Sequence, residues 1–105
     1  MIIKTKRGDF PIRYGWGALA KFGDAAGLSM DDVLKLDMGK MRVSDLLHFL
    51  LAGFEDGARK AGEECKLKSI EEIGDLLDED STVMEKAMEA FGEMTKPGEG
   101  EVKKK

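Results

Sequence analysis

The chain has few of the residues that build catalytic, metal or disulfide sites. Among its 105 residues there is one cysteine, Cys65, and one histidine, His48. A single cysteine excludes a disulfide within the chain, and a lone thiol fits a reducing cytoplasm. A single histidine excludes the histidine clusters that commonly hold transition metals. We therefore expect no metal, no cofactor and no enzymatic activity, because paired catalytic groups are also missing.

Long hydrophobic runs are missing as well. The most apolar stretch, residues 44–54, is far shorter than the roughly 20 residues that a membrane-spanning helix needs. Residues 1–7 contain no extended apolar segment, so we expect neither a signal peptide nor a membrane partner. The formal net charge is -4 and the pI is about 5.1. This balance argues against nucleic acid as the main partner, because phosphate binding depends on clustered Lys and Arg.

What is present is the composition of a globular protein, with 36% charged and 42% apolar residues. Two short strands are expected at Ile2–Thr5 and at residues 10–14, joined by a turn at residues 7–9. Gly8 can adopt the positive φ that such a turn uses, and Pro11 marks its strand as an edge. The hairpin must pack on helices, because an isolated hairpin is marginal in water.

Periodicity and capping signals predict five helices. They are expected at Trp16–Ala26, just after Ser29, from a start within residues 41–44 to about residue 64, at residues 70–77, and at residues 83–94. The spacing of Ser69 to Glu72 and of Thr82 to Glu85 is typical of capping boxes. We expect a mainly α fold with a small N-terminal β-hairpin (α+β), in a compact bundle of about five helices. Residues 1–95 would form one domain and residues 96–105 a flexible charged tail.

The apolar stripes of these helices predict the core. In the first helix the stripe contains Trp16, Leu19, Phe22 and Ala26. In the third helix the apolar face contains Val43, Leu46, Leu47, Leu50, Leu51, Phe54, Ala58 and Ala61, and the opposite face contains Asp45, Glu55, Asp56, Arg59 and Glu63. Gly53, Gly57 and Gly62 interrupt this helix. They either allow the close approach of another helix or mark a break near Gly62.

Two features are candidates for partner binding. Phe49 projects about 120° from the centre of the apolar face, so it either packs in a second layer or is exposed for a partner. The fifth helix carries a ridge of Met84, Met88, Phe91 and Met94. That ridge either caps the core or binds a partner helix, because methionine suits adaptable surfaces. Residues 78–80 are acidic but lack the glycine and closing glutamate of a calcium loop, which indicates a solvated turn.

The order of these elements resembles that of the tail assembly chaperones of long-tailed bacteriophages. In that family a strand pair similar to Ile2–Thr5 and residues 10–14 precedes a helix similar to residues 16–22. An apolar helical segment similar to residues 43–54 follows, and an acidic stretch similar to residues 69–78 leads into the last helices. The resemblance covers residues 1–94 and rests on the order of the segments and their apolar or acidic character.

The resemblance implies a non-enzymatic role. Such chaperones bind the tape measure protein, keep it soluble and help to recruit tail tube protein around it. They self-associate, act in the host cytoplasm and are not retained in the mature virion. Two alternatives remain open: another phage adaptor, such as a head–tail connector component, and a small helical nucleic-acid-binding regulator.

Overall fold

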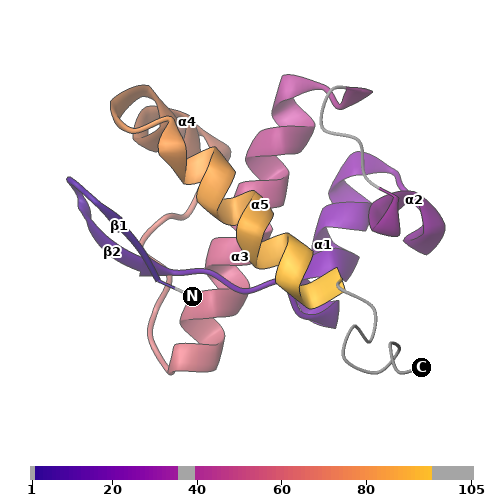
Figure 1. Cartoon of the computed structure of the whole chain (residues 1–105), viewed down its shortest axis with the longest axis horizontal. Helices are drawn as coiled ribbons and strands as arrows, with labels where there is room; N and C mark the ends of the chain where they lie inside the picture. Colours follow the sequence, from indigo (N-terminus) through magenta and orange to yellow (C-terminus); the bar gives the residue numbers. More distant parts are fainter. Residues whose placement is uncertain (1, 36–39, 96–105) are drawn as a thin grey trace.

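The computed structural model describes residues 2–35 and 40–95, which form a mainly α fold with a small N-terminal hairpin (Figure 1). The predicted fold class is therefore confirmed. The predicted tail at residues 96–105 lies outside the described residues. The elements are β1 (Ile2–Thr5), β2 (Gly8–Pro11), α1 (Trp16–Ala26), α2 (Met30–Leu34), α3 (Val43–Ala61), α4 (Ile70–Glu79) and α5 (Thr82–Thr95).

The hairpin is shorter than predicted, and its second strand begins two residues earlier, at Gly8. β1 pairs antiparallel with β2 from Ile2↔Pro11 to Thr5↔Gly8, so Lys6 and Arg7 form the turn. Gly8 has the expected positive φ, at 131°. The second strand ends at Pro11 because the chain then bonds to α3, where the Arg13 N–H donates to the Gly53 carbonyl at 3.0 Å.

The helix ends follow local capping chemistry, with one correction. Ser29 and Asp32 form a reciprocal capping box at the start of α2. At α4 the Ser69 hydroxyl accepts from the Glu72 N–H, whereas the Glu72 carboxylate accepts from Lys68 rather than from Ser69. The predicted box of Thr82 with Glu85 is wrong. Thr82 is already helical, and Asp80 accepts from both its N–H and its hydroxyl, at 3.1 and 2.5 Å.

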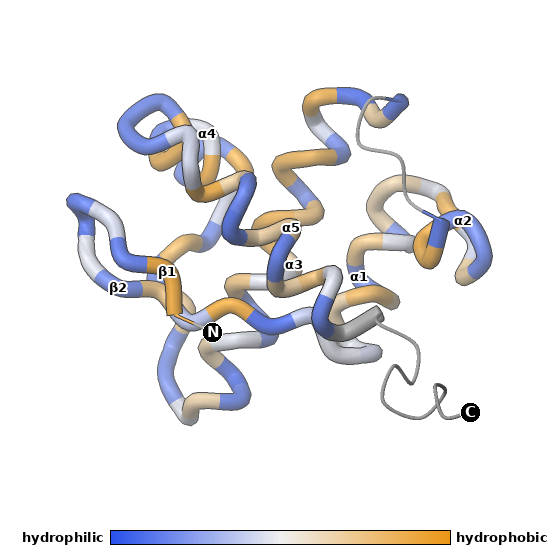
Figure 2. The backbone as a smooth tube through the Cα atoms, in the orientation of Figure 1, coloured by the Kyte–Doolittle hydropathy of each residue, from blue (hydrophilic) through white to orange (hydrophobic). Residues whose placement is uncertain are grey.

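Helix α3 is the central element of the fold and packs against α1, α4, α5 and β2. Figure 2 shows that its N-terminal half is a strongly hydrophobic part of the chain. Because neighbours cover α3 on more than one side, its buried face differs from the predicted one. Asp56 was predicted to face solvent but is 5% exposed, whereas Val43 was predicted in the core and is 72% exposed.

Phe49 lies at the centre of an aromatic cluster, and its side chain is fully buried. Its ring stacks on Tyr14 at a centroid distance of 4.5 Å. Phe22 and Phe91 meet it edge-on at 5.2 and 5.3 Å. The second-layer alternative is therefore correct. The interpretation of Phe49 as an exposed partner-binding residue is wrong, because α1, α5 and the segment after β2 enclose the ring.

Residues 11–15, here called the crossing segment, run from the hairpin to α1 across the surface of α3 (Figure 1). Two glycines of α3 make room for it. A Cβ at Gly57 would lie 2.5 Å from the Pro11 carbonyl, and one at Gly53 would collide with the Tyr14 ring. Gly62 has a different role, because its φ of 76° forms the left-handed C-cap of α3. The close approach at Gly53 and Gly57 is therefore made by the crossing segment and not by a helix, whereas Gly62 marks the end of α3.

A buried carboxylate fixes the end of the crossing segment. Asp56 accepts a hydrogen bond from the Gly15 N–H at 2.8 Å and from the guanidinium groups of Arg13 at 3.1 Å and Arg59 at 2.6 Å. Burial alone would raise the pKa of Asp56. The hydrogen bonds from Gly15 and Arg59 and the two positive charges outweigh burial and lower this pKa. Asp56 therefore joins the start of α1 to α3 as a charged group.

Gly57→Ala is expected to destabilise the protein by about 2 kcal/mol or more, because the added methyl group overlaps the backbone of the crossing segment. Gly74→Ala is the matched control, since a Cβ at Gly74 meets no atom within 4 Å. The control should gain about 0.5–1 kcal/mol from helix propensity. Urea denaturation measures both free energies of unfolding, and similar effects of the two substitutions would contradict the close approach.

Asp56→Asn is expected to cost about 1–3 kcal/mol at pH 7, because the buried partners of the carboxylate lose their charge-assisted bonds. The folded-state pKa of Asp56 lies below its unfolded value. Its contribution to stability is therefore present above the unfolded pKa, about pH 4, and is lost as the pH falls through the folded value. The stability difference between wild type and variant should narrow between pH 5 and pH 2.5 in urea titrations.

The exposed Asp24→Asn is the control for this pH series. This variant makes the same Asp-to-Asn change on α1 but removes no buried hydrogen bond. Its stability should therefore depend on pH as that of the wild type does. A stability difference for Asp56→Asn that stays constant across the acid range would show that folding does not lower the pKa of Asp56.

Candidate partner-binding surface

The structure places most of the predicted partner-binding residues in or against the core. Phe91 is 6% exposed, and Met84 and Met88 are half-buried against the core cluster. The side chain of Met94 lies outside the described residues. The core-capping alternative therefore accounts for Phe91, and only the outer edges of Met84 and Met88 reach the surface.

Trp16 is the large aromatic side chain that the fold exposes, at 63%. The prediction that it begins the core stripe of α1 is wrong. The buried residues of this helix are Ala18, Leu19, Phe22 and Gly23, and at 100° per residue Trp16 lies about 90° from their centre. Because Asp56 holds the Gly15 N–H, the helix starts with the indole turned outward.

An open hollow of about 400 Å³ lies beside this indole. We call it the Trp16 hollow, and it lies between the crossing segment and the C-terminal part of α5. Its lining residues are Ile12, Arg13, Tyr14, Gly15, Trp16, Ala90 and Glu93. Its buried lining residues are apolar, while Arg13, Trp16 and Glu93 are exposed. Asp56 holds the Arg13 guanidinium in place. The hollow therefore has apolar residues at its floor and two charges at its edge: Arg13, which Asp56 holds, and Glu93, which forms no ion pair with another described residue.

A row of carboxylates continues from the hollow along α5. Glu85, Glu89 and Glu93 are exposed and spaced four residues apart, so they share one face of the helix, here called the acidic stripe. No ion pair between described residues involves any of them. Residues 69–95 contain nine acidic residues and one basic residue, a formal charge of -8. This end of the molecule is thus far more acidic than the chain as a whole.

Other exposed apolar side chains belong to different parts of the fold. Met30 and Leu34 of α2 are 47% and 45% exposed, and Val43 at the start of α3 is 72% exposed. Ile2 of β1 is 59% exposed. Single exposed apolar residues are common in soluble proteins. Ile2 also borders a hollow, of about 270 Å³, whose charged lining residues include Lys60 and Glu63. Trp16 differs from these side chains because it is aromatic and because its hollow shares Glu93 with helix α5.

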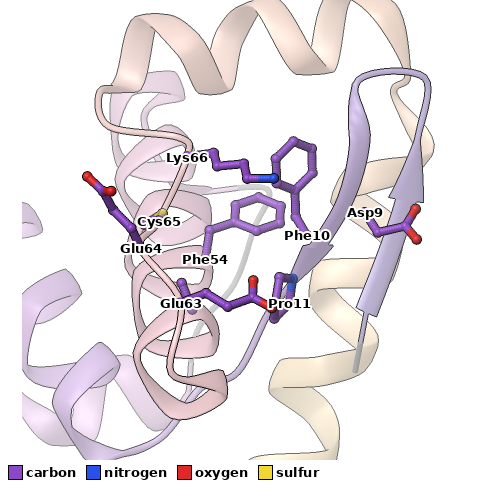
Figure 3. A pocket seen from close by; sticks show the side chains of 9 residues that line it. Asp9, Phe10, Pro11, Phe54, Glu63, Glu64, Cys65 and Lys66 are labelled. Carbon is purple, nitrogen blue, oxygen red and sulfur yellow. The ribbon is translucent and has the colours of Figure 1, made fainter.

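The pocket in Figure 3 is too small to be a ligand site. It lies between β2, α3 and residues 63–66, and its volume of about 10 Å³ leaves room for about one water molecule. Phe10 and Phe54 meet in it edge-on at 5.8 Å. The Cys65 thiol donates to the Leu67 carbonyl at 3.1 Å, and burial raises its pKa. A raised pKa disfavours the thiolate that a reactive cysteine needs.

The acidic residues at the C-terminal end of α4 make structural contacts. Glu79 forms a two-point ion pair with Arg7 at 3.0 and 2.8 Å, which ties the hairpin turn to α4. Asp80 caps α5 through Thr82. Among the described residues there is no group of three His, Cys, Asp or Glu side chains that could hold a metal ion. The helices within residues 2–35 and 40–95 include none that is long and apolar enough to cross a membrane.

Comparisons with known proteins give no further assignment: no protein-family model, no curated protein and no solved structure matches the chain.

Trp16→Ala is expected to change the free energy of unfolding by less than about 0.5 kcal/mol, because the indole is mostly in water. Phe49→Ala, the comparison variant, should cost about 3–5 kcal/mol, since it empties the centre of the aromatic cluster. Chemical denaturation measures both. A large loss of stability in Trp16→Ala would show that the indole packs against the fold, and would remove it as a candidate for partner binding.

Proposed function

We propose that this protein is a tail assembly chaperone of a long-tailed bacteriophage. In this role it binds the tape measure protein, keeps it soluble and helps to recruit tail tube protein around it. The observation that carries the proposal is the exposed Trp16 at its hollow, beside the acidic stripe of α5. This surface belongs to a chain whose order of elements resembles that family.

The physical basis of this role is that the chaperone shields the apolar surface of a helix that would otherwise aggregate. A tape measure protein is long and helical, and its apolar faces associate with one another unless another protein shields them. A small acidic protein that offers an aromatic anchor can bind such a face and also add negative charge to the complex. Several self-associated copies would cover a greater length. The site of action is then the host cytoplasm, and the protein leaves before the virion is complete.

The proposal can be tested by expressing the tape measure protein with and without this chain. We expect the tape measure protein to be largely insoluble alone and to become soluble with the wild-type chain, in a complex that copurifies. Helical content and melting temperature of each chaperone variant serve as controls for folding. A tape measure protein that is equally insoluble in both cases would contradict the chaperone function.

A connector component is distinguished from a chaperone by its presence in finished particles. We expect mass spectrometry of purified virions to detect tube and tape measure proteins but not this chain. Its presence at a fixed copy number would favour the head–tail connector alternative. Retention of the chain on DNA at low salt would favour the nucleic-acid-binding regulator, against which its charge argues.

A further inference from the structure

The Trp16 hollow and the acidic stripe meet at one residue. Glu93 lines the hollow and is also the last carboxylate of the stripe. Ala90, one turn earlier on α5, lies in the apolar lining. An apolar recess and a row of negative charges therefore adjoin on the same helix and form one continuous surface.

We propose that this surface binds a basic amphipathic helix. An apolar side chain of the bound helix covers Trp16 and enters the hollow, and its Lys or Arg side chains lie along Glu85, Glu89 and Glu93. The inference rests on the proposed function for the origin of that helix, a segment of the tape measure protein. The chemistry of the surface itself comes from the residues that form it.

The spacing of the carboxylates suits a helical partner. Glu85 and Glu93 are eight residues apart, which corresponds to about 12 Å along the axis of α5. Basic residues repeated every four positions on a second helix have the same period, so helices lying side by side bring opposite charges together over about two turns. Trp16 then lies at one end of the contact. Tryptophan is among the residues that most often dominate binding energy.

Charge complementarity selects this occupant over others. The carboxylates of the stripe have no ion-pair partner among the described residues. A second copy placed with its own stripe opposite, an acidic helix or a nucleic acid would bring negative charge against negative charge, which disfavours association. A basic helix instead neutralises the stripe while its apolar face removes Trp16 from water.

The test uses labelled helical peptides of about 18 residues, or about five turns. One peptide has a leucine stripe flanked by lysines, a second replaces every lysine with glutamate, and a third scrambles the first so that its apolar stripe is lost. Fluorescence anisotropy measures binding to the full chain. We expect the basic amphipathic peptide to bind at least 10-fold more tightly than either of the others, and to weaken as salt is raised.

Three variants of the chain locate the binding surface. Trp16→Ala and the double variant Glu89→Lys with Glu93→Lys should each weaken binding of the basic peptide at least 10-fold. The matched control, Glu71→Lys with Asp78→Lys, makes the same change of charge on exposed positions of α4. It should weaken binding less than threefold. Circular dichroism melting of each variant confirms that the fold is retained.

The outcomes separate this inference from the proposed function. Equal binding of the basic and acidic peptides, equal effects of the α4 and α5 variants, or no effect of Trp16→Ala would each overturn the inference. If the tape measure protein becomes soluble with wild type and Trp16→Ala alike, the chaperone function stands and the surface is wrong. If the peptide pattern is as expected but the tape measure protein stays insoluble, the surface stands and the proposed function falls.

Discussion

The contact between the crossing segment and α3 determines how the rest of the fold is arranged. Asp56 accepts from the Gly15 backbone and from Arg13, while the missing side chains of Gly53 and Gly57 let the segment lie directly on the helix. A two-stranded hairpin has too little surface to be stable alone. The contact attaches it to the main helix and sets the position and direction of α1.

The same contact decides which aromatic residues are buried and which one is exposed. Tyr14 points into the protein, where its hydroxyl donates to the Phe49 carbonyl at 2.9 Å and its ring covers that of Phe49. Two residues later, Trp16 points outward beside the hollow that the crossing segment forms with α5. The core and the candidate partner surface are therefore opposite sides of one short segment, so changes that loosen the contact should affect both.

Local signals predicted much of the fold. The bounds of α1, the start of α2 just after Ser29 and the fold class follow from nearby residues and are confirmed. The α5 cap was misplaced because the helix already includes Thr82, whose N–H and hydroxyl both donate to Asp80. The burial of Asp56 depends on Gly15, 41 positions away, so helical periodicity assigned it to solvent. Gly53, Asp56 and Gly57 share one face of α3, and that small-residue stripe was the available signal. Trp16 was misplaced because it was assigned to the apolar stripe although helical periodicity puts it about 90° from the centre of the buried face.

In this account the protein uses a rigid junction to present one aromatic side chain next to an acidic helix. Trp16 is the only tryptophan of the chain, so its fluorescence reports directly on the proposed surface. The decisive measurement is the emission and iodide quenching of Trp16 in the complex with a tape measure protein whose own tryptophans are replaced by phenylalanine. The account predicts a blue shift and protection from iodide when the complex forms. A complex that forms while Trp16 keeps the emission and quenching of the free protein would contradict it.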